Sequence, residues 1–158
     1  MEKTVIVMEH LKFIGKFNLS AVNQQNLRIT DFNPKVVSFD DHLKSELKDI
    51  NNLSLPFHCL EICKSKIVKP ASIYEIKNNF SKLPIIPFSQ FLSQTFLMIN
   101  KEGFLETRKN NLFFVEMREG SNIPIIVGKN TSSSKSIWRI RRLAVDSSPL
   151  SVGMGVFH

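Results

Sequence analysis

The stretch Leu112–Val127, LFFVEMREGSNIPIIV, decides the fold class of this chain. Two apolar runs, Leu112–Arg118 and Ile123–Val127, flank the polar turn signal Glu119–Asn122. Short apolar runs on either side of a glycine-containing turn are typical of antiparallel strands. The stretch therefore predicts a β-hairpin. Pro124 lacks a backbone N–H, which predicts that its strand lies at a sheet edge or begins there.

The same pattern continues on both sides of this hairpin. Phe104–Thr107 and Ile137–Val145 are further short apolar or alternating runs, separated from it by loop signals at Lys109–Asn111 and Lys129–Ser134. Evenly spaced strands of this kind predict an antiparallel meander or a small barrel for the C-terminal part of the chain.

The N-terminal part also begins with strand patterns. One face of the first alternating segment carries Leu11, Phe13, Phe17 and Leu19. After the polar break at Asn23–Asn26, Leu27–Thr30 resumes the alternation, which predicts a hairpin. Val36–Phe39 and Phe57–Cys63 are further strand candidates, and Lys64–Lys66 then reads as a basic connector.

A first helix is predicted where the apolar period changes to that of a helix. Leu43, Leu47 and Ile50 are spaced so that they share one side of a helix. Ser38 or Asp40 is the expected N-cap, because a side-chain oxygen there accepts a free N–H of the first turn.

Two more helices are predicted further along the chain. The segment from about Pro70 to Leu83 has proline in its first turn and apolar residues at helical spacing. A third helix is expected from Ser89 to about Met98, although Phe96–Ile99 also fits a strand.

These patterns together predict an α+β fold. N-terminal strands and two or three short helices precede the C-terminal antiparallel β-meander or small barrel. A length of 158 residues fits a single domain, residues 1–158, that buries a core of its own. The alternative is a subdivision into a mixed α/β part, residues 1–100, and a β-rich part, residues 101–158.

The composition indicates a cytoplasmic protein with no membrane partner. No apolar run approaches the roughly 18 residues of a membrane-spanning helix. Met1–His10 holds only a short apolar run closed by a charge, unlike a secretory signal. Cys59 and Cys63 are the only cysteines, which is too few for a disulfide scaffold.

The net charge of +7 is distributed unevenly along the chain. Residues 1–57 contain 7 basic and 7 acidic residues, residues 58–100 contain 5 and 2, and residues 101–158 contain 9 and 5. Between Gly120 and Val145 there are five basic residues and no acidic one. A concentration of positive charge of this kind favours a polyanionic partner such as nucleic acid.

This acid-free segment supplies the candidate nucleic-acid-binding residues, which are Lys129, Lys135, Trp138, Arg139, Arg141 and Arg142. In an extended strand Arg139 and Arg141 share one face, and Trp138 shares the other face with Ile140 and Arg142. Basic side chains neutralise phosphates, and an exposed tryptophan stacks on an unpaired base.

The alternative interpretation of this segment is structural. Trp138 and Ile140 then belong to the hydrophobic core. The arginines form a solvated sheet face, with Glu116 or Glu119 of a neighbouring strand as partners. Under this interpretation the positive charge is incidental to function.

A second group of reactive residue types occurs at Phe57–Lys64, which contains His58, Cys59 and Cys63. A zinc site needs a second Cys or His pair at suitable spacing, which the chain lacks. A cysteine nucleophile needs a neighbouring base, and the sequence alone places no histidine beside either thiol. Glycine-rich phosphate loops and the common hydrolase motifs are also missing. We therefore predict no metal site, no cofactor and no catalytic residue, with both thiols packed as small apolar side chains.

The sequence thus predicts a small non-enzymatic binding protein that contacts nucleic acid or a nucleoprotein complex through its basic C-terminal strands. The alternative is a protein-binding adaptor or inhibitor, of the type encoded by phages and mobile elements, that acts on a host protein. Such a protein uses exposed phenylalanines and strand edges to add a strand to the sheet of its partner. Binding that survives nuclease treatment and moderate salt distinguishes the adaptor from the nucleic-acid-binding protein.

Overall fold

The computed structural model describes residues 10–19, 37–47, 61–99, 103–130, 136–144 and 149–158. Its strands are β1 (Leu11–Asn18), β2 (Val37–Phe39), β3 (Glu61–Ile67), β4 (Ile85–Pro87), β5 (Asn111–Glu116), β6 (Asn122–Asn130), β7 (Ile137–Arg142) and β8 (Gly155–Phe157). Its helices are α1 (Asp41–Leu47), α2 (Ile73–Asn78) and α3 (Phe88–Ile99). The predicted α+β class is confirmed.

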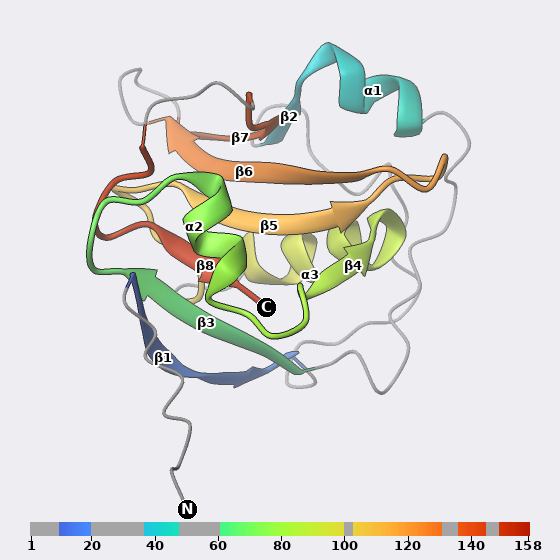
Figure 1. Cartoon of the computed structure of the whole chain (residues 1–158). Helices are drawn as coiled ribbons and strands as arrows, with labels where there is room; N and C mark the ends of the chain where they lie inside the picture. The colour runs from blue at the N-terminus through green and yellow to red at the C-terminus, as the bar shows by residue number, and fades with distance from the viewer. Residues whose placement is uncertain (1–9, 20–36, 48–60, 100–102, 131–135, 145–148) are drawn as a thin grey trace, which may run out of the picture.

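The strands form one open mixed sheet in the order β1-β3-β8-β5-β6-β7-β2, and β4 pairs with β5 outside this path (Figure 1). The antiparallel neighbours β5, β6 and β7 form the predicted meander. A closed barrel is not formed, because β1 and β2 stand at the two ends of the sheet. β8 is parallel to β5 and antiparallel to β3, so it joins the C-terminal strands to strands from residues 1–100.

The β5–β6 hairpin is buried on both faces of the sheet. Phe113 and Val127 belong to a hydrophobic cluster that includes α3, called here the α3-side cluster. Leu112 and Ile126 belong to a second cluster that includes α2, called the α2-side cluster. Figure 1 shows α2 in front of the sheet and α3 behind it. A strand covered on both faces needs consecutive apolar residues, which explains the apolar run in β5.

The third helix, α3, is buried around most of its circumference. Its buried residues are Phe88, Phe91, Leu92, Ser93, Gln94, Thr95, Leu97 and Met98. Phe91 packs edge-on against Phe113 of β5, with ring centroids 5.1 Å apart. The helix predicted from Ser89 is confirmed, and the alternative strand at Phe96–Ile99 is wrong because the helix continues to Ile99.

The second helix, α2, is shorter than predicted. The Ser72 hydroxyl accepts the N–H of Glu75, and the Glu75 carboxylate accepts the N–H of Ser72, which forms a capping box. The helix ends at Asn78, yet Phe80 and Leu83 still pack against the α2-side cluster. The apolar positions were therefore predicted correctly, although the last predicted turn is not helical.

The first strand, β1, does not have the single apolar face that was predicted. A β-bulge between Phe13 and Gly15 adds one residue and reverses the faces beyond it. Leu11 consequently belongs to the α2-side cluster, whereas Phe17 packs against the α3-side cluster. The strand that pairs with β1 is β3, and the predicted hairpin partner Leu27–Thr30 lies outside the described residues.

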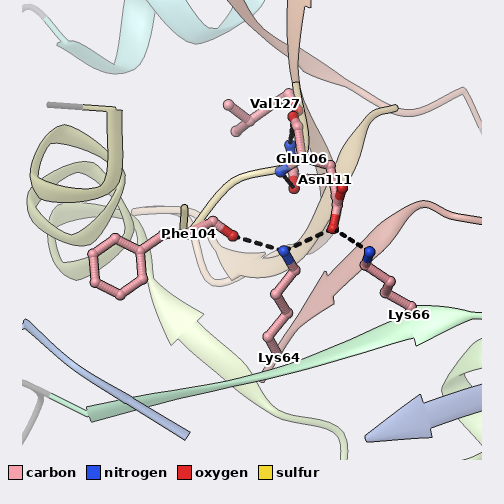
Figure 2. Close-up of polar contacts among 6 residues, drawn as sticks. All are labelled: Lys64, Lys66, Phe104, Glu106, Asn111 and Val127. Atoms are coloured by element: carbon pink, nitrogen blue, oxygen red, sulfur yellow. Dashed lines mark hydrogen bonds and ion pairs between the residues drawn. The ribbon is translucent and has the colours of Figure 1, made fainter. Parts of the chain in front are cut away.

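The basic segment Lys64–Lys66 lies within β3 and is not a connector. Lys64 is buried, and its Nζ lies 2.8 Å from the carbonyl oxygen of Phe104 and 2.8 Å from Oε1 of Glu106. The Nζ of Lys66 lies 3.0 Å from the same carboxylate oxygen, as Figure 2 shows. A buried ammonium is tolerated in the sheet because its hydrogen bonds and its charge are satisfied.

Phe104–Thr107 does not form the predicted strand, and the side chain of Asn111 holds its residue Glu106 in place. Oδ1 of Asn111 accepts the N–H of Glu106 at 2.8 Å, and its amide donates to the carbonyl oxygens of Glu106 and Val127, each at 3.0 Å (Figure 2). The buried side-chain amide of Asn111 thus satisfies both the N–H and the carbonyl oxygen of Glu106, which in a sheet would pair with a neighbouring strand.

Two boundary predictions concern Pro124 and the N-cap of α1. β6 lies between β5 and β7, so Pro124 does not mark a sheet edge, but it is the third residue of the strand and lies near its start.

The N-cap of α1 is Asp40, one of the two predicted candidates. Its Oδ1 accepts the N–H of Leu43 at 2.8 Å. The predicted helix residue Ile50 and residues 57–60 lie outside the described residues.

Candidate nucleic-acid interface

β7 divides the basic segment between the two faces of the sheet. Trp138 and Ile140 are buried in the α3-side cluster, whereas Arg139 and Arg141 are exposed. This is the alternation predicted for an extended strand. Trp138 and Ile140 therefore belong to the hydrophobic core, as the structural interpretation of this segment predicts.

The register between β6 and β7 identifies the face from which the two arginines project. Arg141 lies opposite Ile126, and Arg139 lies opposite Gly128. Residues directly opposite in a sheet share a face, and Ile126 belongs to the cluster that contains Ile76 of α2. Arg139 and Arg141 therefore stand on the same side of the sheet as α2.

Trp138 and Lys129 lie on the opposite face from these arginines. Only 7% of Trp138 is exposed, so its ring is not available for stacking on a base. Lys129 is the cross-strand neighbour of Trp138, and its Nζ lies 5.7 Å from the centroid of the tryptophan ring, a cation–π contact. Of the six predicted residues, Lys135 lies outside the described residues.

Glu116 and Glu119, the predicted acidic partners of Arg139 and Arg141, do not form ion pairs with them. In the described part of the chain, neither Arg139 nor Arg141 forms an ion pair with Glu116, Glu119 or any other carboxylate. Glu119 instead accepts a hydrogen bond from the hydroxyl of Ser121 at 2.7 Å. Two exposed guanidinium groups thus share one sheet face without a described counter-charge.

Arg142 at the end of β7 is held differently from the other two arginines. Its backbone N–H donates to Oδ2 of Asp40 at 2.8 Å, and its Nε lies 4.0 Å from the same oxygen. Because the other oxygen of Asp40 caps α1, this carboxylate links the end of β7 to the start of the helix. Arg142 therefore has a structural role in addition to its charge.

A depression of about 450 Å³ lies between α2 and the ends of β6 and β7. Its lining includes the apolar side chains of Ile73, Pro124 and Leu143 and the polar residues Tyr74, Lys77 and Arg142. The lining also includes Asp40, whose carboxylate contacts Arg142. The depression therefore combines an apolar surface with an aromatic ring, the cation of Lys77 and the Arg142–Asp40 pair, next to the face that carries Arg139 and Arg141.

Tyr74 and Lys77 were not recognised from the sequence as site residues. Ile73 and Ile76 point into the core, which leaves Tyr74 and Lys77 on the outer side of α2. Tyr74 is 63% exposed, and the Nζ of Lys77 lies 5.9 Å from the centroid of its ring. The helical spacing of the two isoleucines was the available signal, but it does not show that α2 lies on the face of the arginines.

The structure also places a histidine beside one of the cysteines. The backbones of Cys63 and His158 exchange hydrogen bonds of 2.8 and 2.9 Å, so the two residues are cross-strand neighbours. The Nε2 of His158 lies 2.9 Å from the Ser65 hydroxyl, and burial lowers the pKa of the imidazole. No hydrogen bond joins the thiol and the imidazole within the described residues, and no three His, Cys, Asp or Glu side chains there gather around a point that suits a metal ion.

Comparisons with protein-family models, with curated proteins and with solved structures return no significant match for this chain. None of the described helices is long and apolar enough to cross a membrane. A functional assignment therefore depends on the chemistry of the surface itself.

Proposed function

We propose that the chain is a non-enzymatic protein that binds nucleic acid, free or in a nucleoprotein complex, on the α2 face of β7. The observation that carries this proposal is the pair Arg139 and Arg141, which are exposed on one sheet face without a described carboxylate partner. Guanidinium groups match the geometry of phosphate oxygens, and neutralising phosphates releases counterions, which favours binding.

The spacing of the two arginines supports a strand of phosphates as their ligand. Residues two apart on a strand are separated by about 6.6 Å, which is comparable with the distance between successive phosphates of an extended single strand. Lys77 extends the positive charge toward the depression next to α2, where the charge of Arg142 is offset by Asp40. Because Trp138 and Lys129 lie on the other face, we do not include them in the proposed surface.

Fluorescence anisotropy with labelled single- and double-stranded DNA and RNA, measured over a series of salt concentrations, tests the proposal. The double variant Arg139→Glu/Arg141→Glu is expected to lower affinity at least about ten-fold. The slope of log K against log salt for a single strand should decrease by about 1.4, because each lost phosphate contact contributes about 0.7. Arg142 is left unchanged because it contacts Asp40.

The matched control is Lys12→Glu/Lys44→Glu, which changes the net charge by the same amount. Lys12 on β1 and Lys44 on α1 are exposed and lie near opposite ends of the sheet (Figure 1). The control is expected to retain most of the binding. An equal loss in both variants would show that only the total charge matters, and unchanged binding by the arginine variant would rule out this surface.

A second candidate function is the protein-binding adaptor or inhibitor, and β1 supports it. This strand stands at one end of the sheet order, and Phe13 and Ile14 are 52% and 44% exposed. A partner strand added to β1 would bury these side chains as it extends the sheet. Co-purification after nuclease treatment in moderate salt is the test. A partner that is retained by the wild type and lost with Phe13→Ser/Ile14→Ser supports the adaptor, whereas nuclease-sensitive binding supports the nucleic-acid-binding protein.

A further inference from the structure

We infer that the depression between α2 and the ends of β6 and β7 holds one unpaired nucleotide of a single strand, whose base stacks on Tyr74. This inference rests on the proposed function and deepens it, because it specifies single-stranded nucleic acid as the preferred ligand. The depression, of about 450 Å³, falls within the ordinary range for sites that take a small organic group.

The chemistry of the lining matches the two parts of a nucleotide. A nucleobase has flat apolar faces, and Ile73, Pro124 and Leu143 offer an apolar surface to such a group. A phosphate is an anion, and Lys77 places a cation at the same depression, where the charge of Arg142 is offset by Asp40. An acidic peptide would use the cation of Lys77 but would leave the apolar lining without a matching partner.

Tyr74 is the residue that favours a nucleotide over other ligands that combine an apolar group with a negative charge. It is the only tyrosine of the chain, and it is 63% exposed although α2 is otherwise anchored by buried isoleucines. Exposed aromatic rings next to basic side chains are the usual stacking platforms of single-strand-binding proteins. The Nζ of Lys77, 5.9 Å from the ring centroid, places a cation near a base stacked on that ring.

A duplex does not fit this arrangement. The bases of a double helix are paired and stacked on one another, so a base reaches a protein ring only after it is unpaired. Arg139 and Arg141 lie on the same face of the sheet and can contact neighbouring phosphates of either a single strand or a duplex. The arginines therefore provide general affinity, and the depression provides the preference for single strands.

The experiment compares Tyr74→Ala, Tyr74→Phe and the control Phe13→Ala, which truncates an exposed ring on β1, outside the lining of the depression and several strands away from β7 in the sheet order. The probes are labelled oligothymidylate of about 12 nucleotides and a duplex of the same length. Tyr74→Ala is expected to weaken single-strand binding about ten-fold with little change for the duplex. Tyr74→Phe and Phe13→Ala are expected to bind like the wild type. Circular dichroism melting confirms that each variant is folded.

A second readout reports on stacking directly. A single strand that contains 2-aminopurine should lose fluorescence on binding to the wild type and not on binding to Tyr74→Ala. Equal losses of single-strand and duplex affinity in Tyr74→Ala, or competition by polyglutamate as effective as that by oligothymidylate, would overturn the inference. If Tyr74→Ala binds normally while Arg139→Glu/Arg141→Glu does not, the nucleotide site is wrong and the proposed function stands. If the wild type binds neither the single strand nor the duplex, both the nucleotide site and the proposed function are wrong.

Discussion

The ammonium group of Lys64 and the carboxylate of Glu106 lie 2.8 Å apart, although 42 residues separate them in the chain. Lys64 is buried between β1 and β8, while Glu106 lies on the segment that precedes β5 and also contacts Lys66. Burial by itself raises the pKa of the Glu106 carboxyl, but the hydrogen bonds and charges of the two lysines outweigh it and leave the pKa below its ordinary value. The carboxylate therefore remains ionised at neutral pH and holds β3 to the segment before β5.

We predict that removing the two partners of this ion pair has unequal effects. Glu106→Ala leaves the buried ammonium of Lys64 without its counter-charge and should lower the free energy of unfolding by about 3 kcal/mol. Lys64→Met should cost roughly 1 kcal/mol, because Glu106 keeps its contact with Lys66. Denaturant unfolding measures both. The exposed pair Lys16 and Glu61 is the control, and Lys16→Met should leave the unfolding midpoint almost unchanged because solvent screens this pair. Equal costs for the two core variants would contradict this account.

A steric prediction concerns Gly155 in β8. A Cβ at this position would lie 2.8 Å from Oδ1 of Asn111, whose side chain is held by three hydrogen bonds and cannot move without breaking them. Gly155→Ala is therefore expected to destabilise the protein by about 1–3 kcal/mol in thermal or denaturant unfolding. Gly15→Ala is the matched control, since nothing lies within 4 Å of a Cβ there. A neutral result for Gly155→Ala would show that Asn111 relaxes freely.

The capping box of α2 gives a prediction about local stability. Ser72→Ala removes the acceptor for the Glu75 N–H and should cost about 1 kcal/mol, whereas Ser72→Asp should be nearly neutral because aspartate also caps helices well. The backbone hydrogen bond from Ser72, which is the main reason that the pKa of Glu75 is low, remains possible in both variants. Identical unfolding midpoints for the alanine and aspartate variants would argue against the cap.

Ser72→Ala also bears on binding, because α2 carries Tyr74 and Lys77. The variant tests whether loss of helical structure at the start of α2 weakens single-strand binding.

The imidazole of His158 predicts a loss of stability on mild acidification. Burial lowers its pKa below the ordinary value of 6.5, so the unfolded chain binds the proton more readily than the folded one. The free energy of unfolding should be highest above about pH 6.5 and should fall as the pH drops from there toward the folded-state pKa. His158→Gln should flatten this dependence in denaturant titrations between about pH 5 and pH 7.5. A pH dependence that persists in His158→Gln would assign it to another group.

The amino-acid sequence by itself determined the elements whose signals are local. The turn at Glu119–Asn122 and the apolar runs beside it specify the β5–β6 hairpin, because turn residues and strand period act over a few residues. Helical spacing likewise located α3 and the buried positions of α2, and Asp40 was among the two expected caps of α1. The alternation along β7 also follows from the sequence, which is why Arg139 and Arg141 were placed together and apart from Trp138.

Only the tertiary structure decided which of these elements meet. The face that joins Arg139 and Arg141 to Tyr74 depends on the register of β6 with β7 and on the side from which α2 covers the sheet. Likewise, the exposure of Phe13 accompanies the position of β1 at one end of the sheet, and the buried ammonium of Lys64 is balanced by the approach of Glu106. Such contacts join residues distant in the chain, so their free energy depends on strand order and on the closure of long loops. Neither of these is contained in the local periodicity of the residues involved.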